Sequence, residues 1–287
     1  MPSINTNTAA NSALRYTNIN TSNQTKFLQQ LSSGKRITKA ADDAASLAIG
    51  SKVTADSVAL AQASRNAANV QSVLNVAEGG LSNISKVLTR LKELLHSAQD
   101  GFHDTASFSA VDKEYQALVT EITNIANTTK FNGVTLIDGA NGTAGNFSNS
   151  SGAVILLGAT SGDTITMSLS SSGAGNNATA TGLSLATTAV TTSAIAASNE
   201  ALIETAIGTV AGFLANIGAL QARVGFRAAQ LDISKENADA TASTLLDADV
   251  AQAQTSYTNA DVLTQSGIAA LQKANAIPQS ILRLLQS

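Results

Sequence analysis

The sequence predicts a mainly α-helical protein: a long antiparallel coiled-coil rod with a small β-hairpin excursion and paired N- and C-terminal helices. Three observations predict this fold class. Apolar residues repeat at alternating steps of four and three over residues 60–98. A second pattern of the same kind follows at 108–125, and a short alternating segment lies near 154–169. Both ends of the chain carry weaker amphipathic patterns.

The longest pattern is a heptad stripe, which we call the heptad seam. Its members are Leu60, Ala63, Ala67, Val70, Leu74, Ala77, Leu81, Ile84, Leu88, Leu91, Leu95 and Ala98. A period of 3.5 residues places all of them on one side of one helix. We expect this helix over about residues 43–99, which would make it about 85 Å long. Such a seam needs other long helices beside it, and rods of this kind are usually mechanical or scaffolding parts.

The segments before the heptad seam predict a weak first helix and a break. Residues 5–31 carry sparse apolar side chains among Asn, Thr, Ser and Gln, so a helix there is marginal by itself. The segment 31–37 reads as a break around Gly34. Asp42 and Asp43 then stand where acidic residues favour a helix N-terminus. Gly79 and Gly80 either weaken the long helix locally or permit close backbone approach.

Two further helical segments are expected to pack against the seam. A helix over about 106–128 can return antiparallel, with the apolar series Phe108, Val111, Tyr115, Leu118, Ile122 and Ile125. Helical pattern resumes near Ile195 and includes Phe213, Ile217, Leu220, Val224 and Leu231. Proline occurs only at positions 2 and 278, so nothing between them forbids continuous helix.

The region 132–192 differs from the rest of the chain. The apolar run at 154–157, the Gly- and Ser-containing turn at 158–163 and the alternation at 165–169 predict a β-hairpin. Residues 170–192 are rich in Ser, Thr, Gly, Ala and Asn, which favours a loop or weakly ordered surface segment. We expect the stretch 143–192 to face outward, either carrying O-linked glycans or shielded by neighbouring molecules.

Composition excludes several function classes. A net charge of −3 argues against a nucleic-acid partner, and the fully apolar runs are too short for a membrane span. The chain has no cysteine, so disulfides and thiolate chemistry are excluded. Residues 1–7 lack the basic and apolar regions of a secretory signal peptide, so export would need another route.

No catalytic, cofactor or metal site is predicted. The two histidines, His96 and His103, are seven residues apart across a glycine break and make a poor metal pair. Asp42 and Asp43 are better explained as helix-start acids than as a catalytic pair. No nucleophile elbow or phosphate-binding loop is present. We therefore expect a protein that is not an enzyme.

Seven short motifs, in family order, resemble bacterial flagellins. They are INTN at 4–7; LSSGKRI at 31–37 followed by ADDAA at 41–45; QASRNA at 62–67; LTRLKEL at 88–94; KFNG at 130–133; AD at 248–249 with QSG at 265–267; and ANAIPQSIL at 274–282. Each motif is weak alone, but their order along the chain makes the resemblance specific.

The resemblance implies a short flagellin without the large outer domains, divided into five parts. These are the N-terminal helix of a filament-core domain (1–41), two parts of a helical rod domain (42–131 and 193–247), the β-hairpin excursion (132–192) and the C-terminal core helix (248–287). The implied function is polymerisation into the extracellular flagellar filament for swimming, after export through the flagellar secretion channel. Implied partners are further copies of the chain, the flagellar cap protein, the junction protein, an export chaperone and the animal innate flagellin receptor. The alternatives are a hook–filament junction protein of the same superfamily and a secreted adhesin or receptor-binding module.

Two sets of residues are candidate contact sites. By resemblance, Arg90, Leu94 and Glu114 match a surface that contacts the adjacent protofilament and the innate receptor. Arg90 and Leu94 lie one turn apart and off the heptad seam, so we expect both to be free for intermolecular contact. The second set is predicted to bury the weak terminal helices in a shared layer and comprises Leu14, Ile19, Phe27, Leu31, Tyr257, Leu263, Leu271, Ile281 and Leu284.

Overall fold

The computed structural model describes residues 7–100, 104–138, 153–168, 177–185 and 189–285, with side chains described as far as residue 276. The chain divides into two compact units, Met1–Ala55 with Asn237–Ser287, and Asp56–Glu236. The division falls inside helices α2 and α4, and each unit is described by itself. The elements are α1 (Thr8–Ser33), α2 (Ala44–Ser97), α3 (Thr105–Thr128), β1 (Lys130–Phe131), β2 (Val134–Thr135), β3 (Ala153–Leu156), β4 (Thr164–Met167), α4 (Ser193–Leu246) and α5 (Val250–Leu285).

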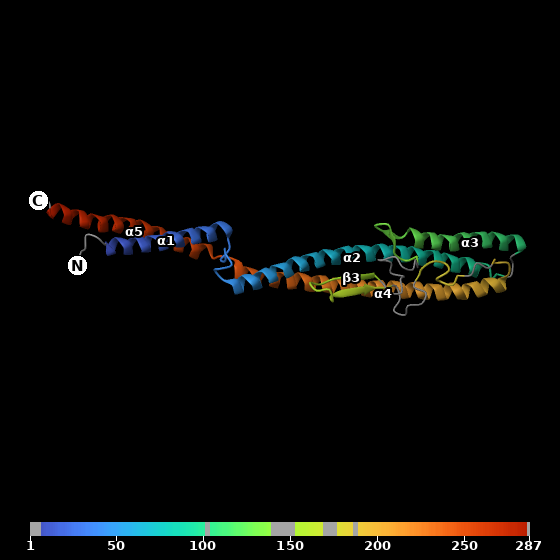
Figure 1. Ribbon diagram of the computed structural model, residues 1–287. Helices are drawn as coiled ribbons and strands as arrows, with labels where there is room; N and C mark the ends of the chain where they lie inside the picture. The colour runs from blue at the N-terminus through green and yellow to red at the C-terminus, as the bar shows by residue number, and fades with distance from the viewer. Residues whose placement is uncertain (1–6, 101–103, 139–152, 169–176, 186–188, 286–287) are drawn as a thin grey trace. The chain divides into compact units, whose positions relative to one another are not determined.

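The second unit is built on the predicted heptad seam. Every member from Ala63 to Ala98 is buried, and only Leu60 at its start is partly exposed. Helix α4 lies beside α2 (Figure 1). The two helices are antiparallel, because residues with rising numbers along α2 contact residues with falling numbers along α4. Three hydrogen bonds mark this register: Ser64–Asp232 at 2.9 Å, Gln221–Asn75 at 3.1 Å and Lys92–Glu204 at 3.3 Å. The mainly helical fold class with a long paired helix is confirmed.

Helix α4 carries a heptad seam of its own. Its buried members are Ala196, Asn199, Ile203, Ala206, Val210, Phe213, Ile217, Leu220, Val224 and Leu231, which include all five residues predicted from the sequence. By length and composition α4 would pass as a membrane span, with a mean hydropathy of 1.4 over 18 residues. Its large apolar side chains, however, mostly face the core shared with α2 and α3, while Ala, Gly and Thr occupy much of the exposed side. That layout is typical of a helix that packs by one face in a helical bundle.

Helix α3 packs on the same core, but its buried face is rotated relative to the prediction. Tyr115, Val119, Ile122 and Ala126 are buried, whereas Phe108, Val111, Leu118 and Ile125 are only partly buried at the edges. The period was predicted correctly. The centre of the face was misplaced because the larger residues Leu118 and Ile125 stand beside the smaller Val119 and Ala126, which can approach α2 more closely.

The described part of this unit contains two hairpins. In β3–β4 the predicted alternation is confirmed, since Ile165 and Met167 are buried while Thr164 and Thr166 are exposed. A second, smaller hairpin, β1–β2, was not predicted. Its turn residues Asn132 and Gly133 both have positive φ, which is the geometry that an Asn-Gly hairpin turn requires. The Asn-Gly pair was therefore an available signal for it.

The expectation of a surface loop over 170–192 is wrong for much of the part that the structure describes. Ala178, Ala180, Leu183, Leu185 and Val190 are all buried and belong to the core cluster. The backbone N–H of Ala178 donates to the carbonyl of Ile137 at 2.9 Å, and that of Val190 donates to the Asp112 carboxylate at 2.8 Å. Apolar residues spaced every two to five positions anchor this segment, although its small-residue composition conceals the pattern.

The first unit contains the two terminal helices, paired antiparallel (Figure 1). Asn7 Nδ2 donates to the carbonyl of Ala274 at 2.8 Å, and Gln24 Nε2 donates to Asp261 Oδ1 at 2.9 Å. Gly34 ends α1 in the left-handed conformation, with φ 67°, which confirms the predicted break. The backbone after it forms a short bridge between Lys35 and Asp247.

Candidate assembly surfaces

The paired helices α1 and α5 bury small residues and expose large ones. Among the described side chains of the pair, the buried ones are alanines: Ala10, Ala253, Ala260 and Ala274. Large apolar residues on the same two helices remain exposed, namely Leu14, Tyr16, Ile19, Leu28, Val250, Val262, Leu263 and Ile268. Gly267 lies against α1, since a Cβ built there would come within 2.5 Å of Thr17 Oγ1. Small residues let the two backbones approach closely, and the large side chains are left over for another surface.

The predicted terminal set falls into three groups. Phe27, Leu31, Tyr257 and Leu271 are half-buried. Leu14, Ile19 and Leu263 are 46%, 47% and 54% exposed, so on the single chain they are not buried in the layer as expected. The side chains of Ile281 and Leu284 lie outside the described residues. The alanines at the centre of this contact were not predicted from the sequence, because large apolar residues give a stronger amphipathic signal than small ones.

Of the predicted surface set, Arg90 and Glu114 form an ion pair, whereas Leu94 is buried. Arg90 Nη2 and Nε lie 2.8 Å and 3.1 Å from Glu114 Oε1, joining α2 to α3, and Glu93 lies 3.5 Å from Arg90 Nη1. The hydrogen bond and charge of Glu114 raise the pKa of the exposed Arg90 guanidinium. Leu94 is only 8% exposed and belongs to the core cluster. The expectation that Leu94 is free is therefore wrong: the core of three helices is wider than one seam.

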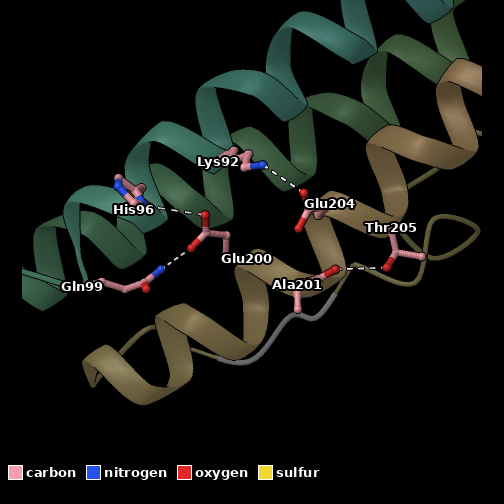
Figure 2. A network of polar contacts seen from close by, with 7 residues as sticks. All are labelled: Lys92, His96, Gln99, Glu200, Ala201, Glu204 and Thr205. Carbon is pink, nitrogen blue, oxygen red and sulfur yellow. Dashed lines mark hydrogen bonds and ion pairs between the residues drawn. The ribbon is translucent and has the colours of Figure 1, made fainter.

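A further polar cluster joins α2 to α4 near the end of the seam (Figure 2). The side chain of Gln99 donates to Glu200, and His96 Nδ1 lies 3.7 Å from the same carboxylate. Lys92 pairs with Glu204 one turn further along. Exposed pairs of this kind contribute little to the free energy of unfolding. Because these pairs flank a buried apolar seam, they are suited to fix the register of α2 against α4, as charged flanking positions do in coiled coils.

The remaining titratable residues support structural roles. Hydrogen bonds from the Ser46 side chain and then from the Ser46 backbone N–H lower the pKa of Asp43. The backbone N–H donates to Asp43 Oδ1 at 3.0 Å, which caps the start of α2 as predicted. Asp42 pairs with Lys26 on α1 at 2.9 Å, and that bond lowers the pKa of Asp42. Within the described residues no cluster of His, Cys, Asp and Glu could hold a metal ion. His96 is exposed, and His103 lies outside the described residues.

Together these features define a helical structural protein whose two ends pair through small residues and present large apolar residues outward. Sequence comparison then gives the family. Residues 4–142 match the bacterial flagellin N-terminal helical region, and residues 201–285 match the bacterial flagellin C-terminal helical region. The chain belongs to the bacterial flagellin family. It is a non-enzymatic subunit of the extracellular flagellar filament, the organelle of swimming motility.

Relatives extend along the whole chain. A flagellin of Halalkalibacterium halodurans is 33% identical over 99% of both chains, and a flagellin of Bacillus subtilis is also 33% identical over 99% of both. The flagellar filament 41 kDa core protein of Borreliella burgdorferi is 28% identical, again over 99% of both chains. Among solved structures, the Bacillus cereus flagellin shares 29% identity over 61% of this chain and 88% of that chain, with a TM-score of 0.41.

Proposed function

We propose that the terminal segments 1–41 and 248–287 form the inner layer of the filament, and that α1 and α5 make its main subunit contacts. The observation that carries this proposal is the inverted packing of the pair: alanines inside, large apolar residues outside. The free energy that the pair gains from its own contact is limited, because the buried alanines have little apolar area and the larger Phe27, Leu31, Tyr257 and Leu271 are only half-buried. The exposed leucines, isoleucines and valines supply that area when neighbouring subunits cover them.

The gain from covering these residues repeats at every subunit. Each large aliphatic side chain fully buried contributes about 1.5–3 kcal/mol. Leu14, Ile19 and Leu263 are each about half exposed, so covering the remainder of all three contributes about 2–4 kcal/mol per subunit by the same scale. Polymerisation is thus driven by apolar surface that a free subunit leaves in water.

The remaining parts of the chain are assigned to the outer layer and to transport. Residues 42–131 and 193–247 form the rod layer of the filament, and the described parts of 132–192 belong to the same layer, because their buried residues pack into its hydrophobic cluster. Arg90 and Glu114 contribute to contact with the adjacent protofilament, since both are exposed and held in a fixed geometry by their ion pair. The family resemblance alone supports two further proposals. They are export through the flagellar secretion channel, and contacts with an export chaperone, a cap protein, a junction protein and an animal innate receptor.

The test of the inner-layer proposal compares polar substitutions inside and outside the exposed set. Ile19→Ser and Leu263→Ser should leave the helix content of the free subunit unchanged, because both side chains face solvent there. They should raise the concentration needed for polymerisation, measured by sedimentation, by about tenfold for each 1.4 kcal/mol lost. Thr258→Ser, an exposed polar position on α5, is the matched control. Polymerisation of both variants at the wild-type concentration would contradict the proposal.

A further inference from the structure

A pocket lined only by polar and charged residues lies between helix α1 and the connection that leads to α2, both in the first unit. Its volume is about 340 Å³. Its main polar groups come from both elements: Ser22, Lys26 and Gln29 on α1, and Thr38, Lys39 and Asp42 on the connection. The three α1 residues are spaced by four and three, so they share one face of the helix. We call these six residues the basic pocket.

The carboxylate in the basic pocket is already neutralised. Asp42 Oδ1 lies 2.9 Å from Lys26 Nζ. Asp42 Oδ2 accepts from the Thr38 hydroxyl at 3.3 Å and from the Lys39 backbone N–H at 3.2 Å. Both carboxylate oxygens therefore hold the connection against α1, and the remaining polar groups of the pocket are left for a ligand.

The groups that remain are hydrogen-bond donors. Among the described residues, none forms an ion pair with Lys39, and none forms a hydrogen bond with the side chain of Ser22 or Gln29. Lys26 donates one of its three N–H groups to Asp42 and keeps the others. Two lysines against one aspartate leave the basic pocket with a net charge of +1.

From this arrangement we infer that the basic pocket binds a phosphate-class dianion, either free or as the head of a small phosphomonoester. A site rich in donors, with a surplus positive charge, complements an anion that has several acceptor oxygens. Lysine binds phosphate as a point charge. A metal cation is disfavoured because both oxygens of Asp42 are engaged, and an apolar ligand would meet only polar and charged residues.

The bound anion would join the two elements that form the pocket. It would connect the Lys39 side chain on the connection to the donors of Ser22 and Gln29 on α1, beside the existing bond between Lys26 and Asp42. The volume of the pocket exceeds that of one phosphate group, so the rest of a small ester also fits. This inference concerns the free subunit and does not depend on the proposed assembly contacts.

Equilibrium dialysis of the full-length free subunit against radiolabelled inorganic phosphate tests the inference, with sodium chloride keeping the ionic strength constant. Binding should saturate at a single phosphate per chain, with a dissociation constant in the millimolar range, because exposed charges are screened by water and salt. Lys39→Ala should raise the dissociation constant by about tenfold, as expected for the loss of one charge-assisted hydrogen bond.

Lys35→Ala is the matched control for this loss. Lys35 is exposed and lies on the same connection but outside the basic pocket, so its replacement removes the same charge. Lys35→Ala should bind phosphate like the wild-type chain, and Lys39→Arg should keep most of the affinity because it keeps the charge. Equal dissociation constants for Lys39→Ala and Lys35→Ala would show that only the overall charge matters, and would overturn the inference.

A neutral variant keeps the test decisive if Lys39→Ala changes the connection. Ser22 is exposed on α1, so Ser22→Ala should leave the helix content measured by circular dichroism unchanged. It should weaken phosphate binding severalfold, because it removes a donor without changing the charge.

Glycerol phosphate distinguishes the two sources of the anion. Stronger competition by glycerol phosphate than by unlabelled phosphate would assign the pocket to a monoester, and weaker competition would assign it to the free anion. Binding of both compounds that rises linearly with concentration, without saturation, would overturn the inference.

Discussion

Two adjacent glycines in α2 provide a matched test of how closely the second unit is packed. Gly79 is exposed, and a Cβ placed there meets no atom within 4 Å. Gly80 is buried, and its Cβ would lie 2.5 Å from Thr129 Oγ1 and 2.8 Å from Thr129 Cγ2. Both positions are helical and inside the same helix, so replacement by alanine gives the same gain in helix propensity at each.

The expected magnitudes have opposite signs. Gly79→Ala should stabilise the protein by about 0.5–1 kcal/mol, the usual gain of alanine over glycine in a helix. Gly80→Ala gains the same amount but overpacks the contact with Thr129, at a cost of about 1–3 kcal/mol. Displacing Thr129 also disturbs its hydrogen bond to the Ile125 carbonyl at 2.7 Å, worth about 1 kcal/mol. The two variants should therefore differ by about 2–4 kcal/mol in the free energy of unfolding.

Thermal unfolding followed by circular dichroism measures this difference. At about 2–4 °C per kcal/mol, Gly80→Ala should melt at least 4 °C below Gly79→Ala. The variant Gly80→Ala with Thr129→Ser, which removes the nearby methyl group, should recover part of the loss. If Gly80→Ala melts at or above the temperature of Gly79→Ala, the close approach of the segment around Thr129 to α2 is refuted.

Three further predictions concern the first unit and the predicted surface set. The pKa of Asp42 is lowered in the folded state, so its contribution to stability is present above its ordinary pKa of 3.8 and is lost as pH falls through the folded value. Asp42→Asn should therefore flatten the dependence of melting temperature on pH below about 4. An unchanged profile would contradict this. Gly267→Ala should weaken polymerisation, because its Cβ would press on Thr17 and separate α1 from α5; sedimentation measures the effect, and normal assembly would exclude the close approach. Arg90→Ala should lower assembly with little change in the free energy of unfolding, because its ion pair is exposed. Leu94→Ala should cost about 2–5 kcal/mol in the free energy of unfolding, because Leu94 is buried. Denaturant unfolding distinguishes the two variants, and equal costs would refute the assignment.

The heptad period was the part of the fold most readily predicted from the sequence. A repeat of 3.5 residues defines the buried side of α2 without knowledge of its partners, so nearly every predicted seam residue is buried. The same reasoning misplaced the face of α3 by one residue. There the partner helices decide the centre of the contact, and Val119 and Ala126 fit closer than Leu118 and Ile125.

Contacts made by small residues were not predictable in the same way. Ala253 and Ala260 carry no signal that separates a buried alanine from an exposed one, although they lie inside the first unit. The segment around Leu183 is anchored by hydrogen bonds to distant elements, which its composition does not reveal. Leu94 was assigned to the surface because one seam was considered, whereas a core shared by three helices buries a wider arc of α2.

The measurement that tests the central claim most directly is electron microscopy of the purified full-length chain after seeding with short filament fragments. The full chain should form long helical filaments, and the fragment 45–245, which lacks α1 and α5, should form none. Circular dichroism should show that this fragment stays helical and melts cooperatively, because it retains the heptad seam. A full-length chain that forms only a soluble oligomer of fixed size, or a 45–245 fragment that forms long filaments, would contradict the account.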